Sequence, residues 1–196
     1  MIEGLRSDMF TIYLYEGKEI KGSSGERLIV EAAKAFCREH QISTEEDTSF
    51  QILRSPEGKP YFPNLPVQFN VSHSGLMWIC MMGLTPCGID IQEVKNCAYK
   101  KMAARYFSRY EQSFVLKGGI ESFFDLWVRR EALGKYTGRG FFDPSIPSFV
   151  DGNGLLIKSA MIGGKQVYIR ELEFTPDIKC AYCSEEEEDE IQIFGG

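Results

Sequence analysis

The stretch FFDLWVRREALGKYTG, from Phe123 to Gly138, places charged residues inside an aromatic helix pattern. On a helical wheel of about 100° per residue, Glu131 falls near the centre of the apolar face, whereas Arg129 points elsewhere. The residues on that face are Phe123, Phe124, Trp127, Val128, Glu131 and Lys135. A buried carboxylate is costly unless it is paired, so Glu131 needs a partner. Two partners are open from the helix alone, an i,i+4 ion pair with Lys135 and a metal ion.

The size and charge of the chain limit the classes of function. Its 196 residues suffice for one large domain or two small ones, and 43% hydrophobic residues exclude wholesale disorder. The net charge of −6 argues against general nucleic-acid binding, which needs a cationic surface. Part of the acidic excess is the uninterrupted run Glu185 to Glu190, which predicts a solvated tail.

The sequence carries no sign of export or of a membrane segment. No N-terminal stretch resembles a signal peptide, and no run approaches the roughly 20 apolar residues of a membrane span. The 6 cysteines are scattered through apolar segments, which predicts reduced thiols in a cytoplasmic protein. Cys180 and Cys183 form a lone C-x-x-C, and without a second pair we favour a buried strand over a metal or redox site.

Apolar periodicity predicts an α+β protein. Strands are expected at residues 9–17, 48–55, 67–73, 76–83 and 87–94, and helices at 24–41 and 96–109. Ser108 and Glu111 have the spacing of a capping box, so a further helix should begin behind Ser108 and precede the long helix at 123–138. Beyond a loop at 138–148, two hairpin signals and a last strand at 177–185 complete the chain. The similar outlines of residues 1–95 and 96–196 suggest a faint duplication, although two unrelated halves remain an alternative.

Asp90 is the second candidate metal ligand. In the strand pattern CGIDIQEV, alternation puts Ile89 and Ile91 on the core face and leaves Asp90 and Gln92 about 7 Å apart on the other. Such oxygen ligands suit Mg²⁺ or Mn²⁺. An aspartate at a strand end is commonly a turn former, so the metal hypothesis requires that the fold bring Asp90 and Glu131 together.

Two short segments have the chemistry of a phosphate site. Arg54 and Lys59 lie in the turn-rich RSPEGKP, and Ser72 and His73 lie near a strand end in FNVSHSG. Cations and hydroxyl groups near strand ends suit phosphate, although a lone histidine is more often structural. The sequence has no Walker A or G-x-G-x-x-G motif, so the usual nucleotide-binding loops are absent.

Five ordered motifs carry a family resemblance: GKPYFP, FNVSHSG, GIDIQ, YFSRYE and FDLWVRREALGKYTGRG. Together they resemble the 4′-phosphopantetheinyl transferases of the surfactin-synthetase-activating type, over residues 26–140 and more loosely in the C-terminal strands. The resemblance implies an α+β pseudo-dimer of two similar halves, each a helix packed on a small antiparallel sheet. The halves would be residues 1–95 and 96–196, with the active site in the cleft between them, and the chain would be monomeric.

The same resemblance implies the reaction. These enzymes transfer the phosphopantetheine arm of coenzyme A to a serine of an acyl or peptidyl carrier protein and release 3′,5′-ADP. Magnesium binds the diphosphate of coenzyme A in the cleft. Which carrier protein is modified does not follow from the sequence.

The resemblance also implies roles for individual residues. Asp90 and Glu131 match the carboxylates that hold Mg²⁺, with Gln92 as a third candidate, and Lys135 matches a lysine that contacts phosphate. Glu111 matches a glutamate proposed as the general base for the carrier serine, a role we weigh equally against the capping box. The remaining positions match residues that contact the phosphates of coenzyme A, with the two arginines assigned to its 3′-phosphate: Arg27, Arg54, Lys59, Ser72 and His73.

The chain departs from the family pattern at two positions. Many members have glutamate where this chain has Gln92, and its neutral amide oxygen predicts weaker metal binding. Arg130 replaces the usual lysine before Glu131, which keeps the charge and changes its geometry. Two other functions stay open: a metal-dependent nucleotide phosphohydrolase that uses Asp90 and Glu131, and a carrier-binding protein without turnover.

Overall fold

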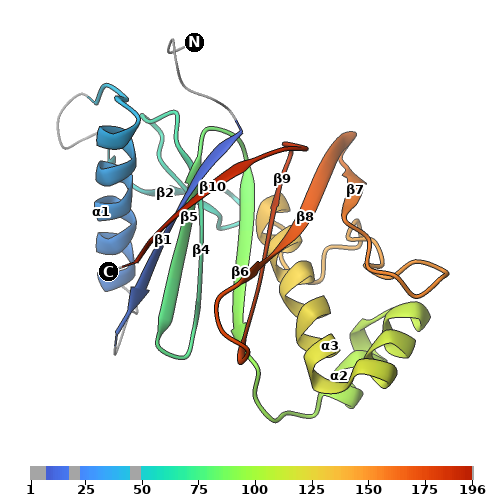
Figure 1. Ribbon diagram of the computed structural model, residues 1–196. Helices are drawn as coiled ribbons and strands as arrows, with labels where there is room; N and C mark the ends of the chain where they lie inside the picture. The colour runs from blue at the N-terminus through green and yellow to red at the C-terminus, as the bar shows by residue number, and fades with distance from the viewer. Residues whose placement is uncertain (1–7, 18–22, 45–49, 196) are drawn as a thin grey trace.

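Two four-stranded sheets, a two-stranded sheet and three helices make up the described residues, 8–17, 23–44 and 50–195, of the computed structural model (Figure 1). The first sheet has the strand order β10-β1-β5-β4 and the second has the order β6-β9-β8-β7. Their bounds are Met9–Glu16 (β1), Gln68–Ser74 (β4), Met77–Gly83 (β5), Cys87–Glu93 (β6), Ser159–Ile162 (β7), Lys165–Glu173 (β8), Ile178–Ser184 (β9) and Glu190–Gly195 (β10). The mixed α+β class expected from the sequence is confirmed.

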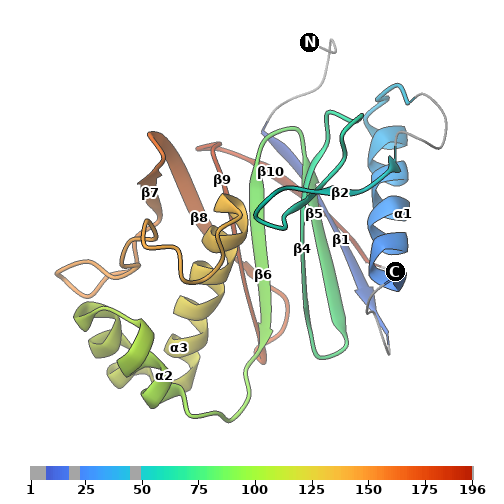
Figure 2. The same ribbon diagram turned by 180° about the vertical axis from the view of Figure 1, so that it is seen from behind.

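Three apolar clusters arrange these elements in layers. Helix α1 (Ser23–Glu39) packs Phe36 and its neighbours against the outer face of the first sheet. The inner faces of the two sheets meet through side chains such as Phe10 and Ile89. Helix α3 (Arg109–Thr137) covers the outer face of the second sheet, where Leu126 is fully buried, and helix α2 (Tyr99–Tyr106) packs against α3. Figures 1 and 2 show this order from α1 through both sheets to α3.

Helix α3 is bent within its length. Gly119 has φ of 75° and ψ of −148°, which interrupts the helix between a first part behind Ser108 and a second part that holds residues 123–137. The predicted capping box is confirmed, because Ser108 accepts a hydrogen bond from the Glu111 amide and Glu111 accepts one from the Ser108 amide. Gly138 ends the helix in the left-handed conformation that glycine favours. Within the described residues, no helix is both long and apolar enough to cross a membrane.

Strand β6 and helix α3 approach each other at a glycine. A Cβ atom on Gly88 would lie 2.1 Å from the carbonyl oxygen of Ala132 and 2.7 Å from the Tyr136 nitrogen. Only the missing side chain permits this contact between the backbones of strand and helix. The close approach places Asp90, two residues further along β6, next to the last turns of α3.

The C-terminal segment differs from its prediction. The strand expected at 177–185 is followed by β10, which pairs in parallel with β1, so it is not the last strand. The acidic run is not a solvated tail, because Glu190 begins β10 and the Asp189 side chain is only 3% exposed. Asp189 accepts hydrogen bonds from Tyr182 and Ser184 and lies 3.2 Å from Arg170. These partners come from β8 and β9, so the run of charges by itself could not reveal them.

Two further expectations are corrected in detail. The strand expected at 48–55 is limited to β2 (Leu53–Arg54), which pairs with β3 (Pro60–Tyr61) across the RSPEGKP turn; residues 48 and 49 lie outside the described part. The helix expected at 96–109 is the shorter α2. Arg129, placed off the apolar face by the helical wheel, is nevertheless buried and lies 2.6 Å from Glu171. The helical wheel was read with a single buried face, whereas α3 is covered on several sides.

Candidate active site

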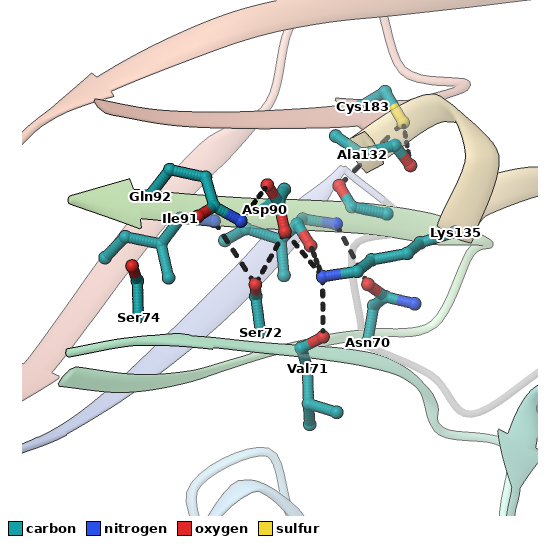
Figure 3. Close-up of polar contacts among 12 residues, drawn as sticks. Asn70, Val71, Ser72, Ser74, Asp90, Ile91, Gln92, Ala132, Lys135 and Cys183 are labelled. Atoms are coloured by element: carbon teal, nitrogen blue, oxygen red, sulfur yellow. Dashed lines mark hydrogen bonds and ion pairs between the residues drawn. The ribbon is translucent and has the colours of Figure 1, made fainter. Parts of the chain in front are cut away.

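Asp90 is the centre of a buried polar cluster between β4, β6 and α3 (Figure 3). Its side chain is 3% exposed. The Oδ1 atom accepts hydrogen bonds from Ser72 Oγ and Lys135 Nζ, both at 2.7 Å, and Oδ2 accepts one from Gln92 Nε2 at 3.3 Å. Three elements that are distant in sequence therefore converge on one carboxylate.

Lys135 pairs with Asp90 and not with Glu131. Its ammonium donates to Asp90 Oδ1 and, at 3.2 Å each, to the carbonyl oxygens of Val71 and Ile89. These three acceptors match the three protons of the ammonium group. The i,i+4 ion pair with Glu131, left open from the sequence, is not formed.

Glu131 lies half-buried beside this cluster. Within the described part of the chain, its carboxylate takes part in no hydrogen bond or ion pair. Burial raises the pKa of Glu131, the charge of Asp90 raises it further, and the charge of Lys135 opposes the rise. The fold thus brings Asp90 and Glu131 within electrostatic range of each other, with one ammonium for two carboxylates.

The donor set fits a hard divalent cation. It offers two carboxylates and the amide of Gln92, which suits Mg²⁺ because that ion commonly uses one or two carboxylates and keeps several waters. A cluster of three or more His, Cys, Asp or Glu side chains of metal-binding type is not found among the described residues. A site at Asp90 would therefore be completed by water or substrate oxygens.

Lys59 lies next to the end of α3. Its ammonium donates to the carbonyl oxygens of Tyr136 at 3.0 Å and Cys87 at 3.4 Å, and burial lowers its pKa. Lys59 and Lys135 both line a cavity of ≈ 260 Å³ between the GKP turn, β4 and the end of α3. A second cavity of ≈ 350 Å³ is lined by Lys59, Tyr61, Phe69 and Tyr136, among others. Lys59 thus lines both cavities, and Lys135, which bonds to Asp90, lines the smaller one.

The other predicted phosphate ligands lie at the surface. His73 is exposed, and strand alternation turns it away from the side of β4 that carries Ser72. Arg54 bonds to the Gly58 carbonyl oxygen at 3.2 Å and lies 3.8 Å from Glu26 in the first turn of α1. Arg27 is exposed and pairs with Glu31 at 3.5 Å. No hydrogen bond or ion pair among the described residues joins these three side chains to Asp90.

Glu111 is fully engaged by the backbone. Its Oε2 accepts from the Ser108 amide at 2.7 Å, and its Oε1 accepts from the Phe149 amide at 2.9 Å. Its exposure is 1%. These contacts give Glu111 a structural role that ties the start of α3 to the loop before β7, and its role as a base stays a prediction.

Two residues of the cluster were not singled out from the sequence. Asn70 and Ser74 lie on the same side of β4 as Ser72, and both are buried. Their signal was present, because the pattern Q-x-N-x-S-x-S puts polar side chains at every second position, and hence on one face, of β4. The contact of Tyr136 with Lys59 could not be found in this way, because it depends on how α3 meets the GKP turn.

Comparison with known proteins places the chain among named relatives. A family model described as "4′-phosphopantetheinyl transferase superfamily" matches residues 86–183. The 4′-phosphopantetheinyl transferase Sfp of Bacillus subtilis (strain 168) is 33% identical over 157 residues, which cover 76% of this chain and 68% of the relative. The transferase gsp of Aneurinibacillus migulanus is 32% identical over 149 residues, and psf-1 of Bacillus pumilus is 39% identical over 97. The chain spans 62% of gsp and 41% of psf-1.

Proposed function

This protein belongs to the 4′-phosphopantetheinyl transferase superfamily, and from that premise we propose that it transfers the phosphopantetheine arm of coenzyme A to a serine of an apo acyl or peptidyl carrier protein. The observation that carries the proposal is the cluster of Asp90, Glu131 and Lys135, which has more negative than positive charge in a partly buried site. A further cation would compensate the excess negative charge of this site, and a cation next to two lysines can hold a diphosphate.

The residues present fit Mg²⁺ or Mn²⁺ at this position. Asp90 and Glu131 would supply carboxylate oxygens, and Gln92 would supply its amide oxygen or orient a bound water. When bound, the ion would neutralise charge on the diphosphate of coenzyme A. Lys135, held by Asp90 and two carbonyl oxygens, would place a second positive charge beside the same group.

Further residues are proposed to contact the phosphates of coenzyme A. Lys59 lines the same cavity as Lys135, and Ser72 bonds to Asp90, which supports assigning both residues to the diphosphate. His73 is assigned to the same group, from the exposed side of β4. Arg54 and Arg27 lie together near the start of α1, which suits the more distant 3′-phosphate.

The transfer itself forms one bond and breaks one. The hydroxyl oxygen of the carrier serine bonds to the phosphorus of the phosphopantetheine group, and the bond from that phosphorus to the departing 3′,5′-ADP oxygen breaks. The serine proton passes to a base. Glu111 is the candidate from the family pattern, and it would have to give up one of its two backbone hydrogen bonds to act.

The finer architecture is part of the proposal. We assign residues 1–95 and 96–196 to the two halves of a pseudo-dimer with the active site between them, an assignment supported by the helix on the outer face of each four-stranded sheet. The halves and the sheets do not coincide, because β6 pairs with β9 and β10 pairs with β1. A monomer is sufficient in this arrangement. All six cysteines are free thiols, which suits the cytoplasm.

A transfer assay tests the function. The protein is incubated with coenzyme A, Mg²⁺ and several apo carrier proteins, and mass spectrometry measures the carriers. A gain of one phosphopantetheine group on a carrier serine is expected. Breakdown of coenzyme A at the same rate without a carrier would instead support the phosphohydrolase, and binding of a carrier without modification would support a protein that lacks turnover.

A further inference from the structure

β4 and β6 meet through side chains. They are the edge strands of their two sheets, they run side by side in the same direction, and neither sheet includes the other strand. Three side chains of β4 accept hydrogen bonds from backbone amides of β6. We call these contacts the rungs: Asn70 Oδ1 to Ile89 N at 3.1 Å, Ser72 Oγ to Ile91 N at 3.3 Å and Ser74 Oγ to Glu93 N at 2.8 Å.

The rungs keep a fixed register. Each joins residues that are 19 positions apart, and both strands advance by two residues from one rung to the next. The three side chains are 5–7% exposed, so each amide of β6 would lose its partner if a rung were removed. A slip of one residue would turn all three side chains to the wrong face of β4.

This register controls the surroundings of Asp90. The rungs satisfy the β6 amides on this edge, which leaves the carbonyl oxygens of Val71 and Ile89 available to the Lys135 ammonium. Ser72 accepts from the Ile91 amide and donates to Asp90 Oδ1, so its hydroxyl is oriented from both sides. Asp90 itself lies between the residues held by the first and second rungs.

We propose that Asn70 and Ser74 are positioning residues for the transfer reaction, which act through β6 to hold Asp90 against Ser72 and Lys135. This inference rests on the proposed function. Neither residue bonds to Asp90, since Asn70 holds Ile89 and Ser74 holds Glu93. The two outer rungs fix the alignment of β4, which carries phosphate-binding groups, with β6, which carries the metal ligands.

A substitution at Ser74 can distinguish a positioning role from direct contact with a ligand. Asn70 lines the cavity beside Lys135 and could contact a ligand directly, whereas Ser74 does not line either cavity at Lys59. Among the described residues, its hydroxyl bonds to the Glu93 amide, three residues beyond Asp90. Removal of this hydroxyl would therefore act on turnover through the rung to β6.

The test compares Ser74→Ala, Ser74→Thr and the matched control Ser159→Ala. Ser159 is also a strand serine, but it lies on β7, at the edge of the second sheet opposite β6, and it lines neither cavity at Lys59. Hydrogen exchange of the Glu93 amide is measured by NMR, together with kcat and KM for coenzyme A. In Ser74→Ala we expect faster exchange at Glu93, a kcat lowered about tenfold and a KM within about twofold of wild type, because small misplacements reduce turnover strongly. Ser74→Thr, which keeps the hydroxyl, should restore both, and Ser159→Ala should change neither.

Several results would overturn the proposal. Faster exchange at Glu93 with an unchanged kcat would show that the rung does not serve turnover, and unchanged exchange would show that the rung does not hold β6. If Ser74→Ala does not fold, the same measurements are made on Asn70→Ala, which removes the rung at the other end of β4. Loss of kcat in proportion to unfolded protein in both variants would leave only a structural role. A wild-type protein that transfers nothing would instead contradict the proposed function. The exchange measurement would still show whether Ser74 protects the Glu93 amide.

Discussion

The two edges of β6 are held in different ways. On one side, β6 pairs with β9 over its whole length, from Cys87 opposite Ser184 to Glu93 opposite Ile178. On the other side, its amides bond to side chains of β4. Regular pairing uses every backbone group on its edge, whereas the rungs leave carbonyl oxygens free for Lys135. The paired edge supports the fold, and the rung edge makes polar groups available for chemistry.

The largest effect on the rate of transfer is expected from a change at Asp90, on the strand edge where β6 bonds to β4. Asp90→Asn keeps the shape of the side chain and removes the charge that Lys135 and a metal ion require, so the rate of transfer should fall by about 10³-fold. The transfer assay measures the rate, and circular dichroism checks the fold. Asp189→Asn is a matched control, because Asp189 is an equally buried aspartate with an arginine partner away from the site. It should keep activity within about threefold of wild type; equal losses in the two variants would contradict a special role for Asp90.

A second prediction concerns the close contact of β6 with α3. Gly88→Ala would place a Cβ atom 2.1 Å from the Ala132 carbonyl oxygen, so backbone must shift, and the free energy of unfolding should fall by about 3 kcal/mol. Urea denaturation measures this change. Gly152→Ala is the control, since its Cβ would meet only the Tyr110 hydroxyl at 3.9 Å. Similar stability of the two variants would show that β6 and α3 are not tightly packed.

The pH dependence of stability tests whether the pKa of Glu131 is raised in the folded protein. Burial and the charge of Asp90 raise its pKa in the folded protein above the value of about 4.3 expected when unfolded. The folded state therefore binds this proton more tightly than the unfolded state does. The stabilisation from proton binding is complete below the unfolded pKa and is lost as pH rises through the raised folded pKa of Glu131. Glu131→Gln cannot ionise, so without Mg²⁺ it should become more stable than wild type across this rise in pH. Melting temperatures in chelator between pH 4 and 8 test this, and a wild type that is the more stable protein at pH 8 would contradict it.

The smallest effect is expected at Gln92. Gln92→Glu adds a charged oxygen ligand, so the apparent affinity for Mg²⁺ should rise about three- to tenfold, with a maximal rate within about twofold of wild type. Titration of activity against Mg²⁺ gives both values. An unchanged affinity would mean that position 92 does not take part in binding the ion.

The local parts of the fold could be predicted from sequence. Helix α1, strands β4, β5 and β6, and the capping box at Ser108 follow from apolar periodicity and from the chemistry of the helix end. β10 was missed because its alternating residues Ile191 and Ile193 directly follow an acidic run, and its parallel pairing with β1 is a long-range contact that no local pattern shows. The partners of Asp189 lie on β8 and β9, and no local pattern points to them.

The faces on which the candidate site residues lie were predictable from sequence, whereas their contacts were not. Alternation placed Asp90 and Gln92 on one face of a strand, and the helical wheel put Glu131 and Lys135 together on α3. The wheel could not show that Lys135 binds Asp90, because that contact depends on the approach of α3 to β6 at Gly88. The rungs were likewise hidden, because their partners are backbone amides of another strand, which have no signature in sequence.

The central claim is that Asp90 and Glu131 share one divalent cation that holds the diphosphate of coenzyme A. Calorimetric titration of coenzyme A into wild type, Asp90→Asn and Glu131→Gln, with and without Mg²⁺, tests it most directly. We expect Mg²⁺ to tighten binding to wild type by about tenfold or more and to leave both variants nearly unaffected. Equal tightening of binding by Mg²⁺ in wild type and in Glu131→Gln would contradict the claim.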